Sequence, residues 1–168
     1  TQNANYYKTD NQATVLKLLQ SINGGEKAKH IKTVVVDTIN GIMVADEMRR
    51  SKEKGYDKWV DLAVAIYDII DFALTMRDDL TVIFIAHTQT DHDDNGYLFT
   101  RIKTSGKKLD KLVVESKLTT VLYAVAKGGN FVFQTHANNS TAKTPFGAFD
   151  SDEIPNDITE VLKALEEY

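Results

Sequence analysis

Two short apolar runs stand out along the chain, and polar residues follow each of them. The first is IKTVVVDT at residues 31–38, in which Val34, Val35 and Val36 form a continuous β-branched run. The second is LTVIFIAH at residues 80–87. Continuous apolar runs of this length are typical of strands that are buried on both faces in parallel sheets. We therefore predict two central parallel strands, joined by a helical crossover.

Four other segments carry apolar residues at helical spacing. A helix capped by Asp10 is expected to end at Asn23, Gly24 and Gly25. Asp157 and Glu160 resemble a capping box at the start of the last helix. The predicted helices contain, in order, Val15, Leu16, Leu19 and Ile22; residues 41–52; residues 56–77; and Ile158, Val161, Leu162 and Leu165.

The remaining segments predict short strands and long loops. TTVLYAVA at 119–126 and FVFQTHA at 131–137 are separated by KGGN, which is a strong hairpin signal. Residues 5–8 are compatible with a short strand. The polar stretches 88–108 and 138–155 have no periodicity, and loops of this length are usually functional or mobile.

These elements predict one α/β domain over all 168 residues, with a mainly parallel central sheet, an antiparallel edge hairpin and helices on both faces. A hydrophobic share of 42% and a charged share of 26% are ordinary for a globular protein. The chain has no apolar run approaching the roughly 18 residues of a membrane span and no signal peptide at Thr1, so we expect no membrane contact and a cytoplasmic location. The absence of cysteine excludes disulfides and thiolate metal sites.

The polar residues after the two apolar runs are the strongest candidates for chemistry. Asp37 and Thr38 follow the first run, and His87, Thr88 and Gln89 follow the second. The carboxyl ends of neighbouring parallel strands meet at the sheet edge where ligands bind. There Asp37 would hold a magnesium-bound water beside Thr38, and His87 would donate a hydrogen bond to a γ-phosphate. The alternatives are that Asp37 simply caps the next segment and that His87 is an ordinary surface or core residue.

The segment from 95 to 108 interleaves aromatic and cationic residues. Tyr97 and Phe99 alternate with Arg101 and Lys103, and two further lysines follow. Aromatic faces stack on unpaired bases while cations follow phosphates, so the pattern predicts a loop that binds single-stranded DNA. A net charge of −4 gives the chain no general affinity for nucleic acid, which restricts such binding to a local cationic loop.

An acidic run, TDHDD, directly precedes this segment and opposes DNA binding. Its carboxylates and imidazole are possible metal ligands, but adjacent residues in a flexible loop rarely converge on one ion. The alternative is a solvated charge run. The residues concerned are Asp91, His92, Asp93 and Asp94.

Five segments taken in order resemble a known family. VVVDT, FIAHTQ, TSGKKLDK, AKTPFG and the terminal IPNDITEVLKALEEY are similar to phage-encoded RecA-like P-loop ATP-binding proteins of single-strand annealing and recombination. The similarity extends over the chain from about residue 31 onward. It implies an oligomeric ATPase core that binds ATP and Mg²⁺ in the host cytoplasm. It also implies that the partners are single-stranded DNA and phage recombination or replication proteins.

The resemblance assigns roles to single residues. Asp37 matches the Walker B acid, and His87–Gln89 match the polar motif that reports the nucleotide state. Lys107 and Lys108 match a position from which such ATPases reach a neighbour's phosphates, and Lys143 matches a lysine near the nucleotide. The alternatives are a solvated basic turn for the lysine pair and plain surface for Lys143.

The chain departs from this family in one respect, because it has no phosphate-binding loop. No segment matches GxxxxGK followed by Ser or Thr, and residues 25–30 and 105–110 lack the spacing. Without that cradle of backbone amides a triphosphate loses most of its contacts, so we expect little ATP hydrolysis by this chain alone. Either the loop lies upstream of Thr1, or the protein is a non-hydrolysing DNA-binding or scaffold module. No catalytic glutamate can be assigned.

Overall fold

The computed structural model describes residues 5–55, 57–104 and 113–168. Contacts divide the chain into two compact units. The first unit comprises Thr1–His87 and Lys103–Val113, and the second comprises Thr88–Ile102 and Val114–Tyr168. The expectation of a single RecA-like domain over all residues stays a prediction.

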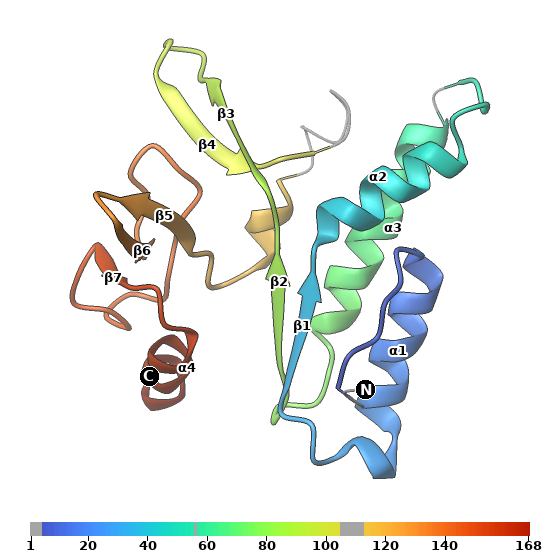
Figure 1. The fold of residues 1–168 in the computed structure, drawn as a ribbon, viewed down its shortest axis with the longest axis horizontal. Helices are drawn as coiled ribbons and strands as arrows, with labels where there is room; N and C mark the ends of the chain where they lie inside the picture. Colours follow the sequence, from blue (N-terminus) through green and yellow to red (C-terminus); the bar gives the residue numbers. More distant parts are fainter. Residues whose placement is uncertain (1–4, 56, 105–112) are drawn as a thin grey trace. The chain divides into compact units, whose positions relative to one another are not determined.

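In its described residues the first unit consists of a two-stranded parallel sheet and three α-helices (Figure 1). The helices lie to one side of the strands, and their buried side chains form the core of the unit. The elements are α1 (Gln12–Gly24), the 3-10 helix η1 (Glu26–Ala28), β1 (Thr33–Asp37), α2 (Ile39–Arg49), α3 (Asp57–Ala73) and β2 (Thr81–Ile85). The core side chains include Val15, Leu19, Ile39, Ile42, Met43, Leu62, Ile66, Ile69 and Ile70.

The amino end of the first unit differs in detail from the prediction. Residues 5–8 form no strand. Helix α1 is capped by Asn11, whose side-chain oxygen accepts a hydrogen bond from the Thr14 amide at 3.0 Å. Asp10, the predicted cap, instead accepts a hydrogen bond from the guanidinium of Arg49 at 2.9 Å. Asparagine and aspartate are similarly good caps, so the sequence could not decide between adjacent residues.

The prediction of a mainly parallel central sheet with helices on both faces is wrong. The only parallel sheet in the described chain has two strands, β1 and β2, and the remaining sheets are antiparallel. Val35 is 52% exposed and Ile85 is 42% exposed, so one face of the parallel pair is open within its unit. An apolar run shows that a segment suits a strand, but it does not show how many strands pair beside it or what covers each face.

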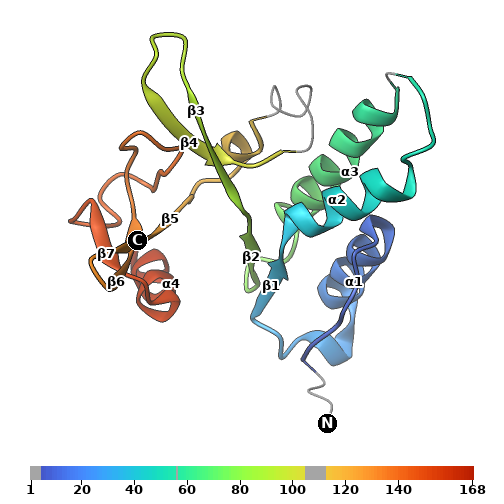
Figure 2. The ribbon, with the colours of Figure 1, turned by 45° about the horizontal axis from the view of Figure 1, so that its top comes forward.

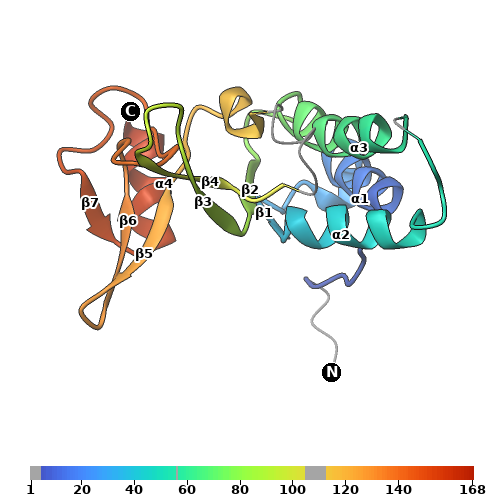
Figure 3. The same cartoon turned by 90° about the horizontal axis from the view of Figure 1, so that it is seen from above.

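The second unit contains two antiparallel sheets and a helix (Figures 2 and 3). Strands β3 and β4 form a hairpin, and β5, β6 and β7 form a three-stranded sheet with α4 beside it. Strand β7, which pairs with β6, was not predicted because it contains only three residues. The elements are β3 (Thr88–His92), β4 (Leu98–Ile102), the 3-10 helix η3 (Val114–Lys117), β5 (Tyr123–Lys127), β6 (Asn130–Gln134), β7 (Glu153–Pro155) and α4 (Ile158–Glu167).

The predicted hairpin and the predicted last helix are confirmed, but the hairpin forms a separate sheet with β7 rather than the predicted edge of the parallel pair. Lys127 and Asn130 pair across a two-residue turn in which Gly128 and Gly129 have φ angles of 58° and 86°. Positive φ at both central positions is the geometry that matches the twist of the flanking strands and that glycine adopts without cost. Asp157 caps α4 by accepting a hydrogen bond from the Thr159 amide at 2.8 Å.

The predicted loop at 88–108 is wrong over most of its length, because it contains the β3–β4 hairpin. The Asp93 side chain closes the turn by accepting hydrogen bonds from the amides of Asn95 at 2.9 Å and Tyr97 at 2.8 Å. Gly96 supplies the positive φ of 84° that the turn requires. The Asn-Gly pair was the available hairpin signal, but the polar strand residues around it hid the pattern.

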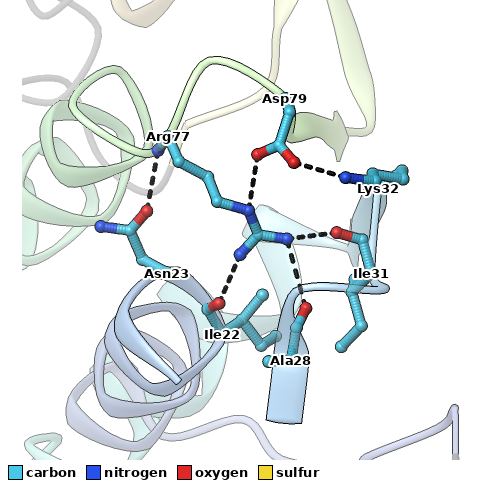
Figure 4. Close-up of polar contacts among 7 residues, drawn as sticks. All are labelled: Ile22, Asn23, Ala28, Ile31, Lys32, Arg77 and Asp79. Carbon is cyan, nitrogen blue, oxygen red and sulfur yellow. Dashed lines mark hydrogen bonds and ion pairs between the residues drawn. The ribbon is translucent and has the colours of Figure 1, made fainter. Parts of the chain in front are cut away.

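Arg77 organises the amino-terminal edge of the parallel pair (Figure 4). Its guanidinium donates hydrogen bonds to the backbone carbonyls of Ile22 at 2.6 Å, Ala28 at 3.2 Å and Ile31. These carbonyls belong to the segment that leads from the end of α1 into β1. One side chain therefore donates to three backbone acceptors, of which the Ala28 carbonyl also accepts a hydrogen bond from the Ile31 amide at 3.0 Å.

Asp79 completes this cluster. Its carboxylate accepts a hydrogen bond from Arg77 Nε at 2.7 Å and pairs with the ammonium group of Lys32 (Figure 4). The pairing with Lys32, together with the hydrogen bond from Arg77, lowers the pKa of the Asp79 carboxyl. Lys32 precedes β1 and Asp79 precedes β2, so the ion pair joins the entries to the two strands.

Candidate functional site

The parallel pairing of β1 and β2 brings the two predicted strand ends to the same edge. Asp37, the last residue of β1, lies opposite Ile85, the last residue of β2. His87 follows two residues beyond that level, and both Asp37 and His87 are exposed. The structure therefore gathers a carboxylate and an imidazole at the carboxyl edge of one parallel pair, within one unit.

The Asp37 carboxylate is not used in holding the fold together. Within the described part of the chain, no hydrogen bond or ion pair involves its side chain. Capping of the next helix belongs to Thr38, whose Oγ1 accepts a hydrogen bond from the Gly41 amide at 3.1 Å. The peptide bond between Asp37 and Thr38 is cis. The structure thus assigns the capping role to Thr38 and leaves the oxygens of Asp37 accessible to solvent and to ligands.

Helix α2 starts directly after this carboxylate. Its first residue is Ile39, so its amino end lies at the edge where β1 ends. The amino end of a helix carries a partial positive charge and favours bound anions. Thr38 uses its oxygen as an acceptor for the cap, which leaves its hydroxyl proton available for donation to another oxygen.

His87 is held by its backbone while its imidazole stays exposed. Its amide donates a hydrogen bond to the side-chain oxygen of Asn40 at 2.6 Å, and its carbonyl accepts one from the Lys103 amide at 2.8 Å. Asn40 also donates from its side-chain nitrogen to the Lys103 carbonyl at 2.6 Å. Asn40 has no local sequence signal, because its two side-chain hydrogen bonds join residues 47 and 63 positions apart.

Thr88 and Gln89, the other two polar residues that follow the second apolar run, belong to the second unit. Thr88 and Gln89 are the first residues of β3. The Gln89 side chain donates a hydrogen bond to Asp91 at 2.9 Å, which directs it along the hairpin. Of the predicted motif His87–Gln89, only His87 therefore shares a unit with Asp37.

The described part of the first unit contains none of the three lysines that the resemblance places near the phosphates. Lys107 and Lys108 lie outside the described residues. Lys143 lies in the second unit, where its backbone forms two hydrogen bonds with Val121, at 2.8 and 2.9 Å, in an isolated antiparallel bridge. Its role near a nucleotide stays a prediction.

Three of the four residues predicted to bind DNA lie on the β3–β4 hairpin. Tyr97 is 69% exposed and Phe99 is 37% exposed. Arg101 forms an ion pair with Asp91 at 3.2 Å, so an acid of the TDHDD run partly neutralises this cation. Lys103 is exposed and belongs to the first unit.

The acidic run is divided by the hairpin rather than gathered into a metal site. Asp91 and His92 are successive residues of β3, and successive strand residues point to opposite faces. Asp93 is engaged in the turn. Among the described residues, no group of three or more His, Asp or Glu side chains is arranged to hold a metal ion.

A polar cavity of about 520 Å³ lies in the second unit and contains none of the predicted site residues. Its acidic side chains are Asp150, Asp152 and Glu153, and His136 lies 3.3 Å from the Asp152 carboxylate. Glu153 is paired with Lys127 at 3.1 Å. The cavity is therefore negatively charged, which disfavours a nucleotide phosphate.

Comparison of this chain with protein-family models, with curated proteins and with solved structures finds no match. Among the described residues, none of the helices is long and apolar enough to cross a membrane.

Proposed function

We propose that the carboxyl edge of β1 and β2 binds the magnesium–triphosphate part of ATP. The observation that carries the proposal is the exposed carboxylate of Asp37, which has no partner among the described residues. It lies at the carboxyl edge from which the chain continues to His87, and directly before the amino end of α2. Magnesium takes oxygen ligands, keeps several waters and is usually held by one or two carboxylates together with substrate phosphates. A single carboxylate beside an anion-binding helix end fits that mode of binding.

The roles of the residues follow from their chemistry. Asp37 would hold a magnesium-bound water, and the free hydroxyl proton of Thr38 would donate a hydrogen bond to that water or to a phosphate oxygen. The imidazole of His87 would donate a hydrogen bond to the γ-phosphate. The backbone of His87 is fixed by Asn40 and Lys103, so this donor would be positioned before the nucleotide binds.

The proposal requires that the main phosphate contacts come from outside residues 1–168, because these residues contain no glycine-rich phosphate loop. With those contacts, ATP would be hydrolysed by positioning and by charge stabilisation of the transferred phosphoryl group. The chain alone is expected to bind Mg–ATP weakly. The resemblance in sequence suggests that the activity serves phage DNA recombination, annealing or replication, in a homo-oligomer.

Nuclear magnetic resonance of the ¹⁵N-labelled chain tests the proposal, because it detects weak binding at single residues. Addition of Mg–ATP is expected to shift the amide signals of Thr38–Gly41 and of His87. Asp37→Asn should weaken binding at least about tenfold, which corresponds to about 1.4 kcal/mol. The control Asp68→Asn removes the same charge from an exposed position on α3 and should leave binding unchanged. Equal binding by Asp37→Asn and wild type would contradict the proposal.

A second candidate function, binding of single-stranded DNA without hydrolysis, is favoured by one observation. The tip of the β3–β4 hairpin exposes Tyr97, Leu98 and Phe99 by 69%, 56% and 37%. Exposed aromatic rings at a hairpin tip can stack on unpaired bases. The ion pair between Arg101 and Asp91 weakens the case, since it engages the cation that would follow the phosphates.

Fluorescence anisotropy with a labelled oligothymidylate tests this second candidate. Tyr97→Ser should weaken binding at least about fivefold, since stacking on one base contributes about 1–3 kcal/mol. Tyr7→Ser is the matched control, because Tyr7 is 64% exposed and lies outside the hairpin. Binding that is sensitive to salt but independent of Mg–ATP would favour the DNA-binding module over the ATPase.

A further inference from the structure

The chain contains three Asn-Gly pairs, and the structure places them in different environments. An asparagine that precedes a glycine is prone to spontaneous loss of its side-chain amide, because glycine has no Cβ to hinder attack by its own backbone nitrogen. The sequence alone does not distinguish the three pairs. They are Asn23-Gly24 in α1, Asn40-Gly41 in α2, and Asn95-Gly96 in the turn between β3 and β4.

The reaction needs a close approach of two atoms that a regular backbone keeps apart. The glycine nitrogen must reach the Cγ atom of the asparagine, which requires a rotation about the asparagine ψ angle. A helix holds that angle near about −42° and so prevents the approach. An exposed turn opens locally at a much smaller cost in free energy. The environment of each pair therefore decides whether it reacts.

Two of the three pairs are held by hydrogen bonds inside the first unit. The Asn23 side chain accepts a hydrogen bond from the Arg77 amide at 2.8 Å, and the pair lies in the last turn of α1. Asn40 is only 8% exposed, and its side chain is bonded at both its oxygen and its nitrogen, at 2.6 Å each. The Gly41 amide donates to the carbonyl and to the side-chain oxygen of Thr38, both at 3.1 Å.

The third pair lies on the surface of the second unit. Asn95 and Gly96 are both exposed, and the Asn95 side chain forms no hydrogen bond with any part of the chain that the structure describes. A Cβ added at Gly96 would meet no atom within 4 Å, so the space around this glycine is open. The side-chain amide of Asn95 is therefore free to leave, and water reaches the same atoms.

Asp93 restrains the turn that contains this pair. Its side-chain oxygen accepts hydrogen bonds from the amides of Asn95 at 2.9 Å and Tyr97 at 2.8 Å. Its backbone carbonyl accepts a hydrogen bond from the Gly96 amide at 2.9 Å. This last bond occupies the nitrogen that has to attack. The Gly96 nitrogen thus becomes available only when the turn opens, and the bonds to Asp93 oppose that opening.

We propose that Asn95 is a site of spontaneous deamidation in the folded protein, and that Asp93 limits the rate by holding the turn closed. The Gly96 nitrogen forms a bond to Cγ of Asn95. The bond from Cγ to the side-chain nitrogen breaks, and this nitrogen leaves as ammonia with the proton that the Gly96 nitrogen gives up. Water then opens the resulting succinimide ring: its hydroxyl adds to one of the two ring carbonyls, and its proton goes to the ring nitrogen.

The product changes the charge and the backbone of the hairpin tip. Ring opening gives aspartate or isoaspartate, so a carboxylate replaces a neutral amide beside Asp93 and Asp94. In isoaspartate the main chain also runs through the side-chain carbon, which lengthens the turn. A more anionic tip disfavours single-stranded DNA, the ligand of the second candidate function. The deamidation itself depends on neither candidate function.

Mass spectrometry of the wild-type chain tests the inference, because trypsin places the three pairs on separate peptides, residues 18–27, 33–49 and 78–101. When the folded protein is incubated at mildly alkaline pH, the deamidated form should accumulate on peptide 78–101 and stay at background on the other two. In urea the three peptides should deamidate at comparable rates. Equal rates in the folded protein, or the same preference for peptide 78–101 in urea, would overturn the proposal.

A variant without the side-chain amide identifies the reacting residue. Peptide 78–101 contains two side-chain amides, those of Gln89 and Asn95. Asn95→Ser should abolish the deamidated form of this peptide. Persistence of that form in Asn95→Ser would overturn the assignment to Asn95.

Two further variants test the role of Asp93. Asp93→Ala removes the side-chain acceptor of two turn amides and should raise the deamidation rate of Asn95 severalfold. Asp94→Ala is the matched control, because it removes the same charge from the adjacent residue, whose carboxylate has no partner among the described residues. This control should deamidate at the rate of the wild type. Equal rates in Asp93→Ala and Asp94→Ala would overturn the restraint assigned to Asp93.

Discussion

Asp37 is distinguished from its surroundings by the absence of a structural role. The neighbouring Thr38 caps α2, and no described side chain pairs with the Asp37 carboxylate. Asp79, at the opposite edge of the same strands, shows the contrasting case of a carboxylate fully engaged with Arg77 and Lys32. Of the two acids at the two edges of one parallel pair, only Asp37 has a carboxylate without a partner among the described residues, as the proposed ligand site requires.

Arg77 is predicted to be the most sensitive charged residue of the first unit. Arg77→Met leaves the carbonyls of Ile22 and Ile31 without the guanidinium donor, whereas the Ala28 carbonyl keeps its bond from the Ile31 amide. The free energy of unfolding should fall by about 2–3 kcal/mol, because unsatisfied polar groups cost about 1–3 kcal/mol each when buried. Urea unfolding measures the change. Arg49→Met, which breaks a more exposed pair with Asp10, should cost less than about 1 kcal/mol. Similar decreases in the free energy of unfolding in Arg77→Met and Arg49→Met would contradict the structural role assigned to Arg77.

Because the pKa of the Asp79 carboxyl is lowered in the folded protein, we predict that the free energy of unfolding depends on pH. Pairing with Lys32, and then with Arg77, lowers its pKa in the folded state, so the folded protein binds the proton less readily than the unfolded chain does. The resulting stabilisation is fully present above the unfolded pKa of about 3.9, and it is lost as pH falls through the lower folded pKa. The unfolding free energies of wild type and Asp79→Asn should therefore differ by a constant amount from neutral pH down to about 5 and converge below about 4.

Asp68→Asn provides the comparison for this pH series. Asp68 is exposed on α3, and no ion pair involves it within the described chain. The free energy of unfolding of Asp68→Asn should differ from that of the wild type by the same amount in acid as at neutral pH. Convergence in both variants would show that the effect comes from net charge rather than from the pairing of Asp79.

At the scale of elements, the β5–β6 turn is predicted to depend on glycine for its backbone alone. Gly129 has a φ of 86°, and an added Cβ would meet no atom within 4 Å. Gly129→Ala should therefore lower stability by about 1 kcal/mol through backbone strain without steric clash. Gly24→Ala, in helix α1 with equally open space, should raise stability by about 0.5–1 kcal/mol. Thermal unfolding measures both stability changes. Changes of the same sign in Gly129→Ala and Gly24→Ala would contradict this prediction.

Elements were predictable where a local signal defines them. Helices α1 to α4, both parallel strands and the β5–β6 hairpin follow from apolar spacing and from the Gly-Gly turn. The β3–β4 hairpin was missed because its strand residues, such as Gln89 and Asp91, are polar, and β7 was missed because it is held only by pairing with β6. Such strands depend on contacts with distant partners, which periodicity does not contain.

At the scale of the whole chain, the sequence predicted the pairing of the two apolar strands better than the sheet around them. The parallel pairing that brings Asp37 and His87 to one edge is confirmed, whereas the mainly parallel sheet is wrong. Strand ends are local features, while the number of strands beside them is set by long-range pairing. The role of Asn40 was invisible for the same reason, since its bonds to His87 and Lys103 join distant segments.

The claim that magnesium and ATP bind beside Asp37 is tested most directly by replacing Mg²⁺ with paramagnetic Mn²⁺ in the presence of ATP. Manganese broadens amide signals most strongly at the residues nearest to the ion. We predict that broadening is greatest at Thr38 and decreases through Asn40 and His87, and that Asp37→Asn abolishes it. Broadening centred on the acidic residues of the second-unit cavity, Asp150, Asp152 and Glu153, with Thr38 unaffected, would contradict the account.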